Sequence, residues 1–150
     1  MDKLKTSSKL KARAISGAAT LITMLIIVTP LCGLIFQCGC DWPWSGLNVR
    51  CNFYKPEAEH QCPWCASMVT GIFSTGLAII SGVLTAIVPS FPLVVYRPEN
   101  EFALRILVGL TVFVLLAILT AGFAALWQNY SLGVGNFLHY LIRFNEDRIG

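Results

Sequence analysis

Three long blocks of apolar residues set the first expectation about the structure. They run from about 14 to 36, from 66 to 88 and from 103 to 127, and no Asp, Glu, Lys or His lies inside them. At about 1.5 Å per residue, a helix over each block crosses a hydrocarbon core of about 30 Å. Backbone polar groups in lipid must pair within the chain, which favours helices. The pattern therefore predicts an all-α membrane protein, a single domain over 1–150 with three transmembrane helices.

Composition supports this class and excludes others. Only 13% of the residues are charged, whereas about 25% is usual in soluble domains. The first block is too long for the core of a cleaved signal peptide, so we expect a retained anchor. The blocks contain no carboxylate, lysine or histidine that would mark an ion pathway. A pump or an ion-coupled transporter working alone is therefore not expected.

The distribution of basic residues predicts the orientation in the membrane. Five Lys and Arg residues precede the first block, whereas the 37–65 loop carries two. Because cytoplasmic segments are enriched in Lys and Arg, we expect a cytoplasmic N-terminus and an extracytoplasmic first loop and C-terminus. A bacterial inner membrane is favoured. Nucleic acid is not an expected partner, because the basic residues lie beside a membrane span: Lys3, Lys5, Lys9, Lys11 and Arg13.

Features outside the apolar cores predict helix ends and packing. Three prolines in 89–98 place the end of the second helix near Val88, and the third is expected to begin at 99–101. Small residues four apart in the second block favour close helix packing. The 130–145 tail predicts an amphipathic helix, lying on the outer surface or packing against a partner subunit. The small residues are Ser67, Gly71, Ala78 and Gly82, and the apolar tail residues are Val134, Phe137, Leu138, Leu141 and Ile142.

The outer loop over 37–65 is the part of the chain that could carry chemistry. It holds five of the six cysteines and three of the four tryptophans. The sixth cysteine, Cys32, precedes the loop and lies just inside the end of the first predicted helix. Tryptophans beside a membrane boundary usually lie at the headgroups, so we expect an interface role for them. The loop residues are Cys38, Cys40, Cys51, Cys62 and Cys65, and Trp42, Trp44 and Trp64.

Two interpretations of the cysteines involve no catalysis. In an oxidising compartment, six cysteines favour a framework of structural disulfides, although their connectivity stays open. Alternatively, Cys38-Gly-Cys40 and Cys62-Pro-Trp-Cys65 are short chelating pairs, with Cys51 between them and His60 nearby. Thiolates and imidazole suit zinc or reduced copper. A zinc or copper ion is therefore the cofactor to consider.

The third interpretation is thiol chemistry at Cys62-Pro-Trp-Cys65, which opens the second helix. A helix N-terminus favours the thiolate. In its position after one span and a loop, this motif resembles that of the quinone-linked disulfide-generating membrane proteins of the DsbB type and, more loosely, the vitamin K epoxide reductases. The resemblance implies a four-helix bundle and, for the DsbB type, a second cysteine pair in a later loop. No cysteine follows Cys65, so Cys38 and Cys40 would have to serve as the second pair.

These features predict the class, a multi-span membrane protein, more firmly than the biochemical function. We expect an accessory subunit or assembly factor of a larger membrane complex, whose Cys-rich loop is stapled by disulfides or holds a metal. Its partners would be the bilayer and other membrane subunits. The alternatives are a membrane thiol-disulfide oxidoreductase and a copper or zinc handling protein. An enzymatic role would rest on Cys62 and Cys65.

Overall fold

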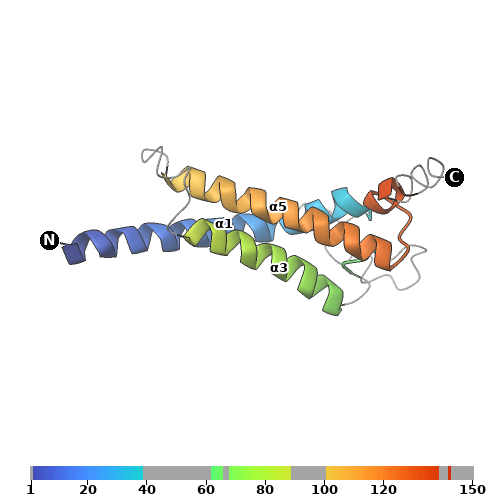
Figure 1. Cartoon of the computed structure of the whole chain (residues 1–150), viewed down its shortest axis with the longest axis horizontal. Coiled ribbons are helices and arrows are strands. Elements are labelled where there is room, and N and C mark those ends of the chain that lie inside the picture. Colours follow the sequence, from blue (N-terminus) through green and yellow to red (C-terminus); the bar gives the residue numbers. More distant parts are fainter. Residues whose placement is uncertain (1, 39–61, 66–67, 89–100, 139–141, 143–150) are drawn as a thin grey trace. The chain divides into compact units, whose positions relative to one another are not determined.

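The computed structural model describes residues 2–38, 62–65, 68–88, 101–138 and 142. Three helices are labelled in Figure 1: α1 (Asp2–Phe36), α3 (Met68–Ile87) and α5 (Glu101–Trp127). Each contains a stretch long and apolar enough to span a membrane, over Leu10–Phe36, Val69–Ile87 and Glu101–Trp127. Within the described ranges there is no strand. The described ranges therefore confirm the predicted all-helical class, with three helices long and apolar enough to span a membrane.

The helices begin and end close to the predicted positions, with one extension. Helix α1 starts at Asp2, so the basic tail is helical as well, and its 35 residues rise about 52 Å against a hydrocarbon core of about 30 Å. Helix α1 ends where Gln37 takes a left-handed conformation with a φ of 53°, a common way to end a helix. Helix α5 begins at Glu101, whose carboxylate faces the positive end of the helix dipole.

The chain divides into two packing units, and unit 1 comprises Met1–Leu25 and Leu77–Leu116. Its centre is Gly82 of α3. A Cβ placed there would lie 2.7 Å from the Gly109 carbonyl oxygen and 3.1 Å from the Phe113 Cβ, and would also contact the Met24 side chain. The small residue predicted to permit close packing therefore lets the α3 backbone approach α5 directly, and packing of this kind is the main attraction between helices in lipid.

A buried arginine closes the end of α3 in unit 1. The Arg105 guanidinium donates to the carbonyl oxygens of Ala86 (3.2 Å) and Val88 (2.9 Å), and it pairs with Glu101 on its own helix at 2.9 Å. Only 4% of the Arg105 side chain is exposed. The last carbonyls of a helix have no partner within it. Arg105 therefore caps α3 from α5, a role that its place at the rim of the third apolar block did not indicate.

Two buried hydroxyls in α1 are satisfied within the helix. Ser16 donates to the Ala12 carbonyl oxygen at 2.9 Å, and Thr20 donates to the Ser16 carbonyl oxygen at 2.7 Å. Such bonds to the preceding turn remove the cost of placing a hydroxyl in an apolar interior. These polar residues are therefore compatible with a membrane span and do not mark a polar pathway.

Unit 2 comprises Ile26–Gly76 and Ala117–Gly150, and it contains the cysteines. Its described part includes the last turns of α1, the 62–65 turn, the start of α3 and the end of α5. Residues 134–138 are helical, and the rest of the predicted 130–145 tail lies outside the described residues apart from residue 142. The interfacial role of the tail therefore stays a prediction.

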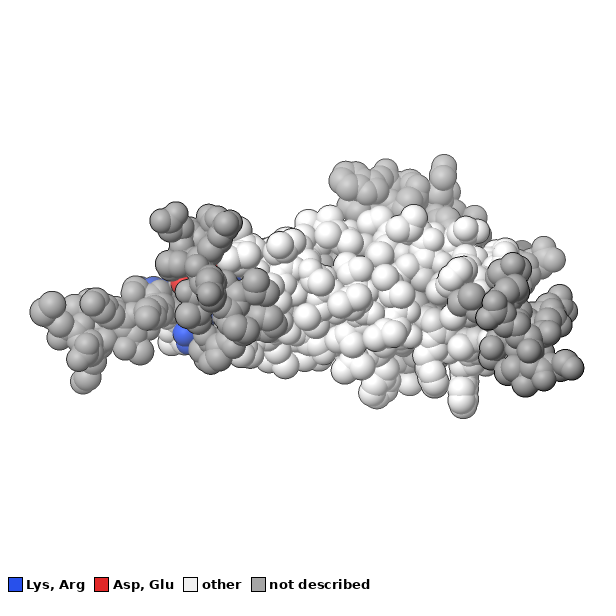
Figure 2. Space-filling view, turned by 45° about the horizontal axis from the view of Figure 1, so that its top comes forward, with Lys and Arg blue, Asp and Glu red and all other residues white. Residues whose placement is uncertain are grey.

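The surface of the spanning helices is largely apolar. In the most apolar windows of the three spans, 22%, 17% and 22% of the residues are buried. On the face drawn in Figure 2, the described surface is uncharged except for a small group of charged atoms. Most side chains of the spans therefore face outward, where lipid tails or apolar partner surfaces can cover them.

Candidate metal centre

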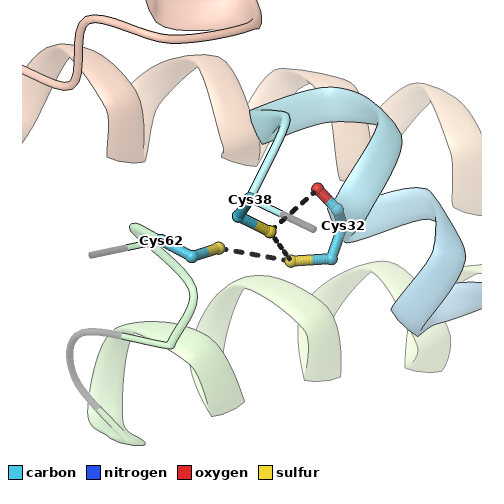
Figure 3. A group of neighbouring side chains, drawn as sticks. All are labelled: Cys32, Cys38 and Cys62. Carbon is cyan, nitrogen blue, oxygen red and sulfur yellow. Dashed lines mark hydrogen bonds between the residues drawn. The ribbon is translucent and has the colours of Figure 1, made fainter. Parts of the chain in front are cut away.

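Three buried cysteines of unit 2 direct their sulfur atoms toward one another (Figure 3). The Cys32 Sγ lies 3.2 Å from the Cys62 Sγ and 3.7 Å from the Cys38 Sγ. All three sulfur atoms lie within 4.8 Å of one another. The group therefore joins the end of α1 to the turn that precedes α3.

The end of α1 places two of these thiols. Cys32 lies one turn before Phe36, the last helical residue, and the left-handed Gln37 then redirects the chain. As a result Cys38 comes back toward the helix, and its thiol donates to the Cys32 carbonyl oxygen at 3.6 Å. This bond fixes the position of the Cys38 sulfur beside the last turn of α1.

The 62–65 turn places the third thiol. The Cys65 amide donates to the Cys62 carbonyl oxygen at 2.8 Å, which closes a tight turn. The Pro63 carbonyl oxygen accepts a 3.1 Å hydrogen bond from the Gln128 side chain, just beyond the end of α5. A Cβ at Gly71 would collide with the Trp64 carbonyl oxygen, so only glycine lets α3 pack so closely on the turn.

An aromatic cluster supports both sides of the thiol group. The Phe36 ring is fully buried and packs edge-on against Trp64 and Tyr130, with centroids 5.3 Å and 5.7 Å away. The Tyr130 hydroxyl donates to the Phe36 carbonyl oxygen at 3.0 Å. Edge-to-face aromatic pairs contribute about 0.5–1.5 kcal/mol each beyond the burial of their area. The cluster therefore fixes the end of α1 against the turn that carries Cys62.

The electrostatic environment keeps the Cys62 thiol protonated. The hydrogen bond with Cys32 lowers the pKa of Cys62, but hydrogen bonds with Cys38 and Cys65, together with burial, outweigh it and raise that pKa well above its ordinary range. Reactive cysteines instead have lowered pKa values in electropositive, partly exposed surroundings. This environment is therefore unlike that of a thiolate nucleophile.

The sulfur geometry fits a soft metal ion. In a tetrahedral zinc site with Zn–S bonds of about 2.3 Å, neighbouring sulfur atoms lie about 3.7–3.8 Å apart. The observed separations of 3.2 Å and 3.7 Å require only small side-chain shifts to reach that spacing. The donor set, three thiols, suits zinc or copper(I). Both separations exceed the length of a disulfide bond, about 2.05 Å, so these are thiols in contact.

The structure adds Cys32 to the cysteines that the sequence grouped into chelating pairs. Cys38 meets Cys32 and Cys62, and Cys65 is half-buried beside Cys62. Trp64, expected at the membrane interface, is buried against Phe36 because its ring completes the aromatic cluster. The other candidates lie outside the described residues: Cys40, Cys51, His60, Trp42 and Trp44. Bridges that involve Cys40 or Cys51 therefore stay a prediction.

Sequence reasoning did not identify the residues that hold the thiols in place. Phe36 and Tyr130 are 94 positions apart, and Gln128 and Pro63 are 65 apart. The available signal was weak, namely a tyrosine and a glutamine directly after the third apolar block, where the chain leaves the span. Only the folded arrangement shows that they support the 62–65 turn.

No protein-family model, curated protein or solved structure matches this chain. The class therefore rests on the chain itself. With three helices long and apolar enough to span a membrane, it is an all-helical, multi-span integral membrane protein.

Proposed function

We propose that this protein is an accessory subunit or assembly factor of a larger membrane complex, and that Cys32, Cys38 and Cys62 bind one soft metal ion, zinc or copper(I). The observation that carries the proposal is the convergence of three buried thiols, all within 4.8 Å of one another. The metal would fasten the end of α1 to the turn before α3, and so hold the extracytoplasmic loop in a defined position. The N-terminus would lie in the cytoplasm.

The arrangement supports metal binding beyond ordinary packing. Cysteine often behaves as a small apolar residue in protein interiors, which would explain burial alone. Here the side chains also point at one another, and they come from both sides of a long loop, because Cys32 and Cys62 are 30 positions apart. The Gln128 side chain donates to the Pro63 carbonyl oxygen on one side, and the Tyr130 hydroxyl donates to the Phe36 carbonyl oxygen on the other. The Phe36 and Trp64 rings pack against each other between the two sides. Such support around the ligands is typical of metal sites.

The surface and composition of the spans support the accessory role. Their outward faces are apolar, and little of each span is enclosed by the chain itself. The apolar blocks also lack a carboxylate, lysine or histidine of the kind that marks an ion pathway. Their one arginine, Arg105, is bonded to carbonyl oxygens at the end of α3 and to Glu101. A protein of this kind acts through what it binds, and a metal-stabilised loop gives a membrane complex a rigid docking element.

Metal content tests the proposal directly. The protein would be purified in mild detergent without chelator, and zinc and copper per chain measured by elemental mass spectrometry. We expect about one ion per chain, as a single thiolate centre requires. Cys62→Ala should lose the ion, while Ser74→Ala, which changes a described residue of α3 outside the cluster, should keep it. Wild-type protein that carries no ion and takes none from added zinc or copper(I) would end the proposal.

A second candidate is a thiol-disulfide oxidoreductase. The 3.2 Å contact between the Cys32 and Cys62 sulfur atoms and the Cys62-Pro-Trp-Cys65 turn favour it. A Cys62–Cys65 disulfide would take two electrons from a dithiol substrate, which becomes a disulfide, and the reduced pair would pass them to a quinone. The raised pKa of Cys62 opposes this role. Quinone-dependent oxidation of a dithiol that Cys65→Ser abolishes would favour this candidate over metal binding.

A further inference from the structure

The four described cysteines of unit 2 differ in their access to solvent. Cys62 is fully buried, and Cys32 and Cys38 are 5% and 8% exposed, whereas Cys65 is half-buried. Cys65 also adjoins the group, because its amide donates to the Cys62 carbonyl oxygen at 2.8 Å across the 62–65 turn. The cluster therefore has three inner sulfur atoms and one outer sulfur atom that adjoins them.

The position of the outer sulfur atom is fixed by the fold. Both residues between the paired cysteines are held, Pro63 by the Gln128 hydrogen bond and Trp64 by burial against Phe36. The Cys65 amide is held in turn by the Cys62 carbonyl oxygen. Since the backbone on both sides of the turn is anchored, the exposure of Cys65 is a built-in property of this turn.

Metal exchange between thiolates needs such an outer position. The thiolate is the form that binds metal, and an ion moves between thiolate sites when an incoming thiolate binds before an outgoing one leaves. Cys32, Cys38 and Cys62 are at most 8% exposed, so an external carrier has little access to their sulfur atoms. Cys65 is half-buried and adjoins Cys62 in the 62–65 turn, so it can be reached from outside and can pass the ion inward.

We infer that Cys65 is the receiving ligand through which a thiolate-bound zinc ion, or by the same route copper(I), reaches the Cys32–Cys38–Cys62 group. This inference rests on the proposed function. In the first step Cys65 sulfur bonds to the ion, the bond to the carrier thiolate breaks, and the Cys65 proton passes to the carrier. In the second step the ion bonds to Cys62, its bond to Cys65 breaks, and the Cys62 proton passes to Cys65. As the ion then bonds to Cys32 and Cys38, its remaining bonds to carrier thiolates break and the two thiol protons pass to those carriers. No electrons are transferred, and the oxidation state of the metal is unchanged.

The test compares the rate of loading with the final amount loaded. Metal-depleted full-length protein in detergent would be mixed with zinc held by glutathione, and uptake followed by rapid desalting and elemental analysis. Cys65→Ala should take up zinc about tenfold more slowly or worse, the change that an interaction of about 1.4 kcal/mol lost from a transition state produces. It should still reach the same zinc content as the wild type. Ser74→Ala, a substitution of the same small size in α3 outside the cluster, is the control and should load at the wild-type rate.

A second variant separates ligand chemistry from structure. Cys65→His offers an imidazole, which also binds zinc, and should restore fast uptake. Equal rates for wild type and Cys65→Ala would overturn the inference, as would slow uptake in both Cys65 variants. Complete loss of zinc from Cys65→Ala would overturn it as well, because Cys65 would then be a permanent ligand. If the wild type binds no zinc or copper(I), the proposed function fails, which is a different result from any of these.

Discussion

Replacing Gly82 by alanine tests whether close backbone packing holds the helices of unit 1 together. The new Cβ would lie 2.7 Å from the Gly109 carbonyl oxygen and 3.1 Å from the Phe113 Cβ. The Met24 side chain, which also contacts this position, can move aside because it is flexible. The Gly109 oxygen belongs to the backbone of α5, so α3 itself would have to shift away.

The same helix provides the control. A Cβ at Gly76 would meet no atom within 4 Å. Both substitutions gain the same helix-propensity term, about 0.5–1 kcal/mol in favour of alanine, and this term cancels when the two variants are compared. The remaining difference is the cost of overpacking at Gly82, about 1–3 kcal/mol. Gly82→Ala should therefore have a free energy of unfolding about 1–3 kcal/mol below that of Gly76→Ala.

Reversible unfolding in mixed micelles gives the required numbers. Each variant would be titrated with sodium dodecyl sulfate in a mild detergent, and unfolding followed by circular dichroism, because all four tryptophans lie in unit 2. Free energies of unfolding for the two variants that agree within about 0.5 kcal/mol, the usual scatter for neutral substitutions, would refute the reasoning. The α3–α5 approach at Gly82 would then be tolerant of a methyl group, and packing there would not determine the stability of the unit.

Three further predictions concern the cap, the aromatic cluster and the thiols. Arg105→Met keeps the apolar stem but leaves carbonyls at the end of α3 without a partner, so the same titration should show a free energy of unfolding lower by about 2–4 kcal/mol. Glu101→Gln alters a half-exposed ion pair and should lower it by less than about 1 kcal/mol. Similar losses for the two variants would contradict the capping role of Arg105. Tyr130→Phe should cost about 1–2 kcal/mol, because it leaves the Phe36 carbonyl oxygen unpaired, and an unchanged stability would show that water replaces the hydroxyl. The raised pKa of Cys62 means that its thiol carries a proton, which must leave when metal binds. Zinc affinity should therefore fall as pH falls, and binding should release protons into a weak buffer. A zinc affinity that does not change with pH would exclude this thiol as a ligand.

The spans could be predicted because they depend on local properties. Length and apolarity alone determine whether a segment can cross a bilayer as a helix, and the predicted 103–127 block differs from α5 only at its first residues. The close approach at Gly82 was also foreseeable, since small residues four apart are a local pattern. The helical basic tail was not, because charge patterning gives orientation and says little about where a helix begins.

The thiol group depends on contacts that no local pattern contains. The sequence suggested Cys38 with Cys40, which lies outside the described residues. It did not indicate that the left-handed residue Gln37 brings Cys38 back to Cys32. The contact from Cys32 to Cys62 crosses 30 positions and exists only because aromatic rings pack between the two segments. Arg105 is a similar case, since its partners are carbonyls of another helix.

The separation of 30 positions between Cys32 and Cys62 also sets a delay between their synthesis on the ribosome. A ribosome that adds about 5–20 residues per second produces Cys62 about 1.5–6 s after Cys32. During that interval Cys32 and Cys38 have been synthesised without their third partner, and synthesis of the residues that will form α3 has not yet begun. The complete group of three sulfur atoms therefore exists only after the chain has returned to the same side of unit 2, and its formation reports that the loop has been fully synthesised.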